Sequence, residues 1–125
     1  MIRYGGILGS IAVKIVKLAL FLTITAAPAF GYPINAKDAT AHLGTTATIE
    51  GRMSVYRMPS GEIYLDLDGK DQNAPVSGYI SRWNAIKFSD VVKLDGKTVD
   101  ITGTITTFRK RPEIFVSDPS QIAVK

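Results

Sequence analysis

The side chains of this sequence that could do chemistry together are aromatic rings interleaved with cations. They are Tyr56, Arg57, Tyr64, Tyr79, Arg82, Phe108, Arg109, Lys110 and Arg111. Aromatic rings stack on nucleobases, each stacked base contributing about 1–3 kcal/mol, and basic side chains neutralise the phosphates between them. The combination predicts a face that binds single-stranded nucleic acid or oligonucleotides.

Acidic residues oppose this prediction because they share the predicted face with Tyr64. Glu62, Asp66 and Asp68 alternate with apolar residues in the same short segment, and their negative charges would repel phosphate. In the alternative interpretation, the tyrosines cover a small domain and residues 109–111 form a solvated hairpin tip. In a further alternative, the same face recognises a protein or a small ligand, and the sequence leaves these possibilities open.

The sequence has few of the residues that catalytic and metal-binding sites use. His42 is the only histidine and no cysteine occurs, which excludes a histidine-based triad, a multi-histidine metal site, a thiolate site and a disulfide framework. The acidic run 66–71 resembles a calcium-binding loop, but Ser77 stands where such a loop needs its bidentate glutamate. No segment matches the arginine and carboxylate motifs of secreted thermonucleases. We therefore expect no catalysis, no metal and no cofactor.

Much of the excess positive charge lies at the N-terminus. The sequence has 15 basic and 11 acidic residues, a net charge of +4. Arg3, Lys14 and Lys17 belong to the first 29 residues, which contain no acid, so the rest carries 12 basic against 11 acidic residues, a net charge of +1. A strongly basic domain would favour nucleic-acid binding, whereas this nearly neutral one requires local clusters of cations to supply the phosphate contacts.

The first 29 residues have the order of a secretory signal peptide. Basic residues come first, the apolar run 18–27 follows, and the Ala-Pro-Ala run 27–29 supplies the small residues that signal peptidase accepts. Residues 29–31 offer a second cleavage site. Processing would place the protein in the periplasm or outside the cell.

A retained membrane anchor is the alternative for the same segment. Residues 7–27 are long enough, since a spanning helix needs about 20 apolar residues. Lys14 and Lys17 interrupt the stretch, and each charge at a helix centre costs roughly 2.5–3.5 kcal/mol on insertion scales. The uninterrupted run is therefore shorter than a span and favours cleavage, and only an uncleaved leader would hold the protein at the membrane.

Past residue 44 the sequence alternates apolar and polar residues, which is the period of half-buried strands. We expect a lead-in segment at 30–44 with one helical turn at 36–42, then strands at 45–56, 62–68, 76–81, 99–105 and 114–116 with a short helix at 83–92. Gly51 and Gly103 stand in the middle of the first and fourth strands, as bulges or sharply coiled corners of a small barrel require. The inward positions predict a core of Ile49, Leu65, Ile80, Ile101, Ile105 and Ile114.

This series of strands predicts one all-β domain at 45–125, a five-stranded Greek-key barrel preceded by the signal peptide at 1–29. An SH3-like barrel also has five strands, but the short helix between the third and fourth strands favours the oligonucleotide/oligosaccharide-binding (OB) fold. An OB barrel binds across its second and third strands, flanked by the loops that join strands one to two and four to five. The candidate aromatic and basic residues fall mainly on these strands and in these loops.

Two segments of the sequence resemble a known family. Residues 98–122, TVDITGTITTFRKRPEIFVSDPSQI, are similar to the end of small bacterial OB domains of the tRNA-anticodon-like nucleic-acid-binding group, and residues 42–56, HLGTTATIEGRMSVY, are similar to their first strand. A second similarity, in size, leader and acidic second strand, is to the periplasmic stress-tolerance OB proteins. The resemblance implies an exported, non-catalytic OB-fold binding module whose partner is single-stranded nucleic acid or a periplasmic protein.

Overall fold

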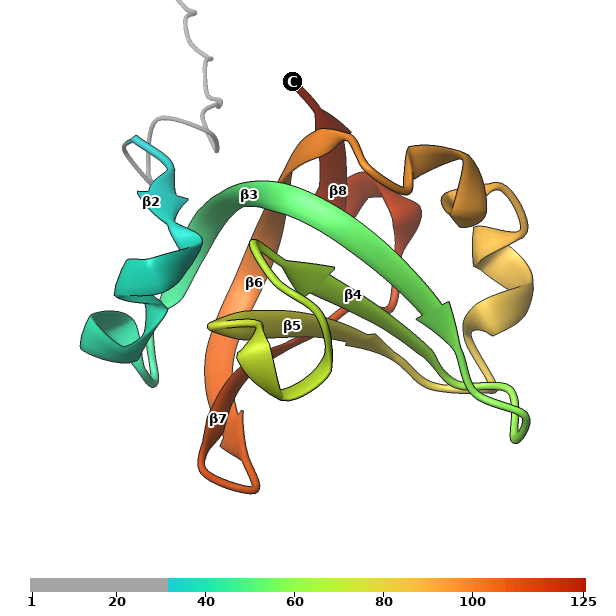
Figure 1. Ribbon diagram of the computed structural model, residues 1–125, viewed down its shortest axis with the longest axis horizontal. Coiled ribbons are helices and arrows are strands. Elements are labelled where there is room, and N and C mark those ends of the chain that lie inside the picture. Colours follow the sequence, from blue (N-terminus) through green and yellow to red (C-terminus); the bar gives the residue numbers. More distant parts are fainter. Residues whose placement is uncertain (1–31) are drawn as a thin grey trace, which may run out of the picture. The chain divides into compact units, whose positions relative to one another are not determined.

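The computed structural model describes residues 32–125, and the predicted signal peptide at 1–29 lies outside them. The strands (β) and 3-10 helices (η) are, in chain order, β2 (Ile34–Asn35), η2 (Ala36–His42), β3 (Thr46–Arg57), β4 (Ile63–Leu67), η3 (Asp71–Asn73), β5 (Val76–Ile80), η4 (Ala85–Phe88), η5 (Val91–Leu94), β6 (Thr98–Phe108), β7 (Arg111–Phe115), η6 (Pro119–Gln121) and β8 (Ile122–Val124). Figure 1 shows β3 to β7 wrapped around a common interior. Among residues 32–125, no helix is long and apolar enough to cross a membrane.

Strand β3 is long enough to belong to both halves of the barrel. Its alternating sequence buries Ile49 and Met53 on the inner side. The part of β3 up to Arg52 pairs with β6, and the part from Met53 onward pairs with β4. Gly51 stands beside this change of partner, where an added Cβ would lie 3.0 Å from the Cβ of Leu67. Because glycine has no Cβ, β3 can pass this close to β4 at the corner of the barrel.

The pairing of β3 with both β4 and β6 closes the sheet into a barrel. The neighbours run β3-β4-β5-β7-β6 and back to β3, with β5 and β7 parallel and the other barrel pairs antiparallel. The predicted five-stranded Greek key is thus confirmed, with β3 to β7 as its strands in chain order. The short strands β2 and β8, which pair with β3 and β6 respectively, were not part of the prediction.

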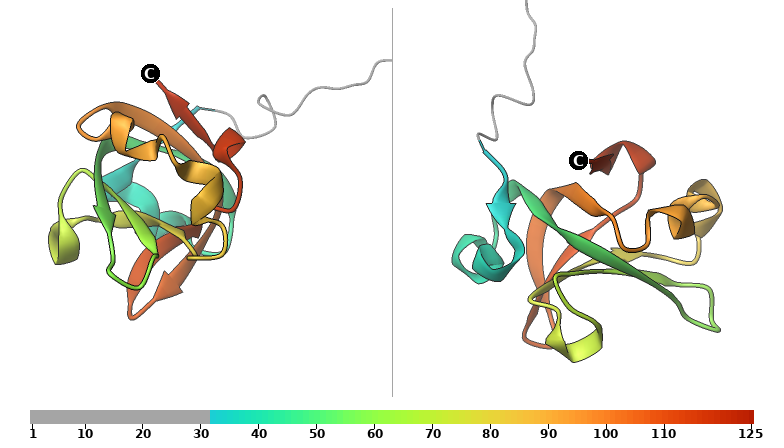
Figure 2. Two further views of the ribbon diagram at one scale, coloured as in Figure 1. Left: turned by 90° about the vertical axis from the view of Figure 1, so that its right-hand side faces the viewer. Right: turned by 45° about the horizontal axis from the view of Figure 1, so that its top comes forward.

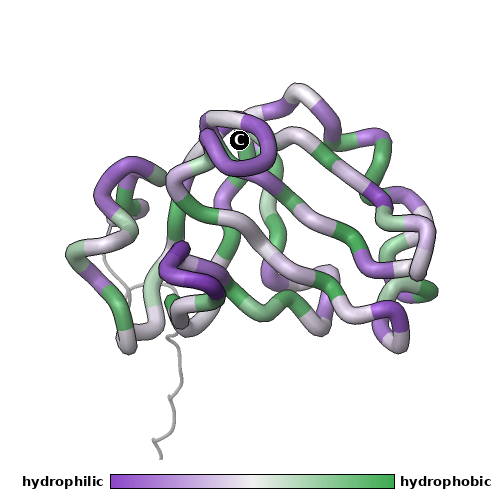
Figure 3. The backbone as a smooth tube through the Cα atoms, turned by 60° about the horizontal axis from the view of Figure 1, so that its bottom comes forward, coloured by the Kyte–Doolittle hydropathy of each residue, from purple (hydrophilic) through white to green (hydrophobic). Residues whose placement is uncertain are grey.

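The predicted core is confirmed. Ile49, Leu65, Ile80, Ile101, Ile105 and Ile114 are all fully buried. The alternation that places them inside can be followed in Figure 3, where hydrophobic positions recur between more hydrophilic ones along the strands. At one end of the barrel η2 buries Ala36 and Ala39 (Figure 1). At the other end η4 and η5 bury Phe88 and Val91. The end-on view in Figure 2 shows these two helices at that end of the barrel.

Two features differ in detail from the prediction. The helix expected at 83–92 is a pair of short 3-10 helices, η4 and η5. The loop between β6 and β7 contains only Arg109 and Lys110, because both strands extend further towards each other than predicted. Both residues have positive φ, 52° and 68°, as two-residue hairpin turns of type I′ require. The turn therefore places two cations at the tip of a regular hairpin.

Candidate binding face

Outward-facing aromatic residues from four neighbouring strands form a row across the barrel. Tyr56 on β3 lies opposite Tyr64 on β4, Tyr64 lies opposite Tyr79 on β5, and Tyr79 lies beside Phe115 on β7. The ring centroids of Tyr64 and Tyr79 are 5.3 Å apart with planes tilted by 56°, and those of Tyr79 and Phe115 are 5.4 Å apart with planes 5° from parallel. We call these four residues the aromatic row.

The tyrosines at the centre of the row are partly buried by their neighbours. Burial raises the pKa of the Tyr64 phenol, and the negative charges of Glu113 and Glu62 act in the same direction. Burial also raises the pKa of Tyr79, whereas the charge of Arg82 opposes this rise. Both phenols therefore stay protonated well above neutral pH and present neutral rings with a hydroxyl group that can donate a hydrogen bond.

A second row, of polar residues, runs beside the aromatic row, two positions along each strand. Ser54, Asp66, Ser77 and Glu113 are neighbours in the strand pairing and make up this polar row. Asp66 and Ser77 are buried, and the Ser77 hydroxyl donates to Oδ1 of Asp66 over 2.6 Å. The backbone N–H of Asp71 donates to Oδ2 of Asp66 over 2.8 Å. Both oxygens of the Asp66 carboxylate are thus used within the protein, where they order the loop between β4 and β5.

The other two acidic residues of the predicted face also have local partners. Asp68 Oδ1 accepts the backbone N–H of Arg52 over 2.7 Å. The Ser60 hydroxyl donates to Glu62, and this hydrogen bond is the main cause that lowers the pKa of the Glu62 carboxyl. Glu62 therefore stays ionised at neutral pH and leaves negative charge at the border of the aromatic row.

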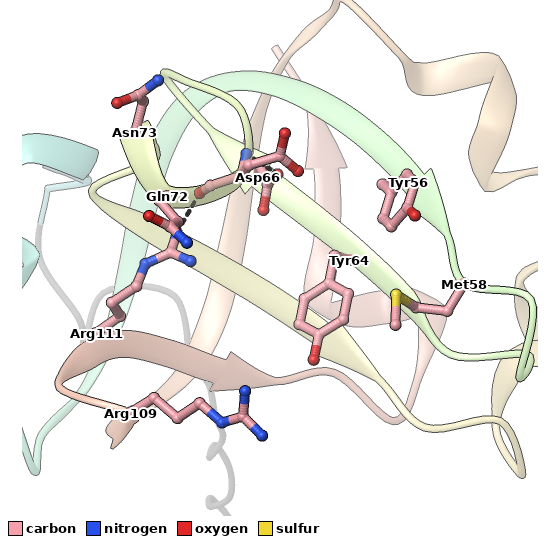
Figure 4. Close-up of a pocket in the computed structure, with 9 residues that line it drawn as sticks. Tyr56, Met58, Tyr64, Asp66, Gln72, Asn73, Arg109 and Arg111 are labelled. Carbon is pink, nitrogen blue, oxygen red and sulfur yellow. Dashed lines mark hydrogen bonds between the residues drawn. The ribbon is translucent and has the colours of Figure 1, made fainter.

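The two rows border a depression between the β4–β5 loop and the β6–β7 turn. Its larger part, about 730 Å³, is lined by Tyr56, Met58, Tyr64, Asp66, Arg109 and other residues, most of which Figure 4 labels. A smaller part, about 500 Å³, lies towards Glu113 and Phe108. Tyr64, Arg109 and Arg111 line both parts. A ligand in this depression would therefore meet a ring, cations and carboxylates together.

The cations of the β6–β7 hairpin differ in what they contact. The Arg109 guanidinium lies 5.2 Å from the centroid of the Phe108 ring, and its side chain extends below Tyr64 in Figure 4. Arg111 Nη2 donates to the backbone carbonyl oxygen of Asp71 over 2.5 Å and to that of Ala74 over 3.0 Å. Arg111 thus holds the β4–β5 loop against the hairpin, while Arg109 and the exposed Lys110 are available to a ligand.

The remaining candidate cations lie beyond the other end of the aromatic row. The Arg82 guanidinium stacks 4.5 Å from the centroid of the Trp83 ring, and Trp83 is 76% exposed, so this ring does not fill the end of the barrel. Arg57 follows Tyr56 directly in β3. Since successive strand residues point to opposite faces, the structure brings Arg82 but not Arg57 towards the aromatic row.

The barrel is similar to solved structures, although comparisons of the sequence alone find no match. No protein-family model matches the sequence, and no curated protein matches it. An aspartyl tRNA synthetase from Entamoeba histolytica matches with a TM-score of 0.52 and 20% identity, over 74% of this chain and 21% of the synthetase chain. The barrel order and this match agree. The chain has an OB fold.

A smaller protein also matches the OB-fold barrel. The hypothetical protein ygiW from E. coli has a TM-score of 0.47 and 20% identity, over 76% of this chain and 91% of that chain. The present chain thus spans most of ygiW but only about a fifth of the synthetase. The barrel order and the synthetase match confirm, at the level of the fold, the OB-fold resemblance indicated by the sequence.

In the OB-fold numbering the second and third strands are β4 and β5, so Tyr64 and Tyr79 lie where OB folds bind their ligands. Sequence reasoning missed Phe115, although alternation around the inward residues Ile114 and Val116 would have placed it outside. It also missed Glu113, which the same alternation would have placed outside, directly before Ile114. Within residues 32–125, no group of three or more His, Asp or Glu side chains is arranged to hold a metal ion.

Proposed function

We propose that this protein is an exported, non-catalytic OB-fold module that binds single-stranded nucleic acid or oligonucleotides across β4 and β5. The observation that carries the proposal is the aromatic row, in which rings from four strands lie side by side on the binding surface of the fold. Successive bases of a single strand can stack on such rings without any requirement for a particular sequence.

Cations flank the aromatic row and would contact the phosphates. Arg109 and Lys110 lie at the hairpin tip on one side, and Arg82 lies on the other. Because the chain past its first 29 residues has a net charge of only +1, these local charges must supply the electrostatic attraction. We therefore expect binding that depends on stacking as much as on charge.

Export to the periplasm or the outside of the cell is the second part of the proposal. It is supported by the order of charge, apolar run and small residues in the first 29 positions. Mass spectrometry of the protein purified from its producing cells should find an N-terminus directly after residue 29 or 31. A protein that still carries Met1 would contradict the proposed processing.

Fluorescence anisotropy with a labelled thymidine oligonucleotide at low salt tests the binding. Tyr64→Ala should weaken affinity by about 1–3 kcal/mol while leaving its salt dependence unchanged, because a stacking ring and no charge is lost. Tyr32→Ala is the matched control, since Tyr32 is 92% exposed and outside the aromatic row. Equal effects of both substitutions would contradict a binding role for the row.

A protein or small-ligand partner at the same face is the alternative, and the acidic residues at its border favour it. Glu62, Asp66 and Asp68 place negative charge beside Tyr64, which suits a partner with cationic or hydrogen-bond-donating groups. If the wild-type protein shows no affinity for single strands even at low salt, this alternative becomes the better proposal.

A further inference from the structure

Glu113 occupies a distinctive place on the binding face. It belongs to the polar row on β7, beside Ser77 on β5, and it lines the smaller part of the depression together with Tyr64. Its side chain is half-buried. Among residues 32–125, no hydrogen bond or ion pair reaches its carboxylate, since the Thr106 hydroxyl bonds only to its backbone carbonyl oxygen.

The neighbouring carboxylate of the polar row is in the opposite situation. Both oxygens of Asp66 accept hydrogen bonds, one from the Ser77 hydroxyl and one from the backbone of Asp71. The Ser77 hydroxyl is therefore already used and does not serve Glu113. Consequently Glu113 is the member of this pair of carboxylates whose acceptor positions remain open to a molecule in the depression.

A half-buried carboxylate without donors is unfavourable for the protein alone. Partial removal from water disfavours the charged form, and burial accordingly raises the pKa of Glu113 despite the positive charge of Arg111 nearby. A ligand that brings N–H donors to this carboxylate would offset the loss of hydration. A phosphate could not do so, because it carries acceptors and negative charge.

Among the bases, guanine has the donor pattern that a carboxylate fits. Its N1–H and one N2–H lie side by side on the Watson–Crick edge, so that two carboxylate oxygens can accept both in parallel. Adenine and cytosine place a ring acceptor beside their amino group, and thymine places carbonyl oxygens on both sides of N3–H. In those bases an acceptor would face the carboxylate and repel it.

We propose that Glu113 makes the binding face select guanine at the position that stacks on Tyr64. The base plane would rest against the Tyr64 ring, and its Watson–Crick edge would point across the smaller part of the depression to the Glu113 carboxylate. This inference rests on the proposed binding of single strands. It adds a preference for one base to a surface whose stacking rings accept any base.

The test uses labelled thymidine oligonucleotides in which one central residue is replaced by deoxyguanosine, deoxyadenosine, deoxycytidine or deoxyinosine. Deoxyinosine keeps N1–H but lacks the N2 amino group. The oligonucleotide with deoxyguanosine should bind about tenfold tighter than the one with deoxyinosine, as expected for a bidentate contact. Glu113→Gln should abolish this advantage, because its amide presents a donor in place of one acceptor. Affinity for the all-thymidine oligonucleotide should rise in this variant, because a negative charge that repels phosphate is removed from the face.

Glu62→Gln is the matched control, because it removes the same charge from the border of the face without touching the smaller part of the depression. A guanine preference that is lost in both variants, or that survives in Glu113→Gln, would overturn the assignment of Glu113. Equal affinity of the deoxyguanosine and deoxyinosine probes, with the all-thymidine probe still bound, would overturn the guanine preference alone. Absence of binding to every probe would overturn the proposed function and this inference with it.

Discussion

Tyr79 on β5 and Phe115 on β7 lie with their rings parallel and offset, with ring centroids 5.4 Å apart and planes 5° from parallel. The contact arises because β5 and β7 pair in parallel and bring these two residues into register. Tyr64 packs on the other side of Tyr79, with the centroids 5.3 Å apart. Rings from three strands thus form one continuous surface on which neighbouring bases could stack.

Replacing Phe115 by Ala should weaken oligonucleotide binding with little effect on folding. Phe115 is 63% exposed, so its removal leaves no cavity in the core, whereas the loss of one stacked base amounts to about 1–3 kcal/mol of binding free energy. Anisotropy titrations measure the affinity, and Phe115→Leu serves as the control that keeps apolar bulk without a ring. Full affinity in the Leu variant would show that stacking on this residue is not needed.

Substitutions in the β6–β7 turn can remove positive charge from the candidate binding face and at the same time stabilise the fold. Arg109→Asn and Lys110→Gly together remove two cations and supply the residues that type I′ turns prefer at positive φ. We expect the unfolding free energy to rise by about 1 kcal/mol, since non-glycine residues pay for left-handed backbone. The slope of log affinity against log salt should flatten by up to about 1.4, the value for two phosphate contacts to a single strand.

Arg111 should behave differently from these two cations. Its guanidinium bonds to the carbonyl oxygens of Asp71 and Ala74, so Arg111→Ser should release the β4–β5 loop and lower stability by about 1–3 kcal/mol. Urea denaturation followed by circular dichroism measures the unfolding free energy of Arg111→Ser and of the double variant in the turn. An Arg111→Ser protein as stable as the wild type would contradict the bracing role that the geometry assigns to this side chain.

Ile101 tests the assignment of the barrel core. Its side chain is fully buried, and Ile101→Ala should lower the unfolding free energy by about 2–5 kcal/mol, because the substitution leaves a cavity in a small domain. Ile86→Ala removes the same atoms from a residue that is 84% exposed and should change stability by no more than about 0.5 kcal/mol. Similar midpoints in urea for the two variants would contradict the core assignment.

The stability contribution of Glu113 should depend on pH. Burial raises the pKa of its carboxyl in the folded state, so the folded protein holds this proton more tightly than the unfolded chain does. The ionised side chain therefore lowers stability at neutral pH, and this cost disappears as the pH falls through the folded pKa to below the unfolded one. Glu113→Gln should accordingly raise Tm at neutral pH and lose this advantage in acid.

The ionised side chain of Glu62 should affect stability in the opposite direction to that of Glu113. The hydrogen bond from Ser60 lowers the pKa of Glu62, so its ionised form favours folding above the unfolded pKa, and this contribution is lost as the pH falls through the folded pKa. Glu62→Gln should therefore not raise Tm at neutral pH. A rise in both variants would point to a general relief of negative charge instead of the burial of Glu113.

The strands and the core could be predicted from the sequence because alternation is a local property. Each residue two positions from a buried one is itself directed inward, so the pattern around Ile101 and Ile105 suffices to place both in the core. The corner glycine could be predicted for the same reason, since Gly51 interrupts a strand that is otherwise regular. These predictions need no knowledge of which strands are neighbours.

The tertiary structure decided which residues make up the candidate binding face. Phe115 meets Tyr79, and Arg111 reaches the carbonyl oxygen of Asp71, only because β7 lies beside β5 in the closed barrel. The same pairing leaves Glu113 beside a serine whose hydroxyl is already bonded to Asp66. Strand order follows from how the whole chain buries its apolar side chains, so contacts between distant segments form only when the barrel closes.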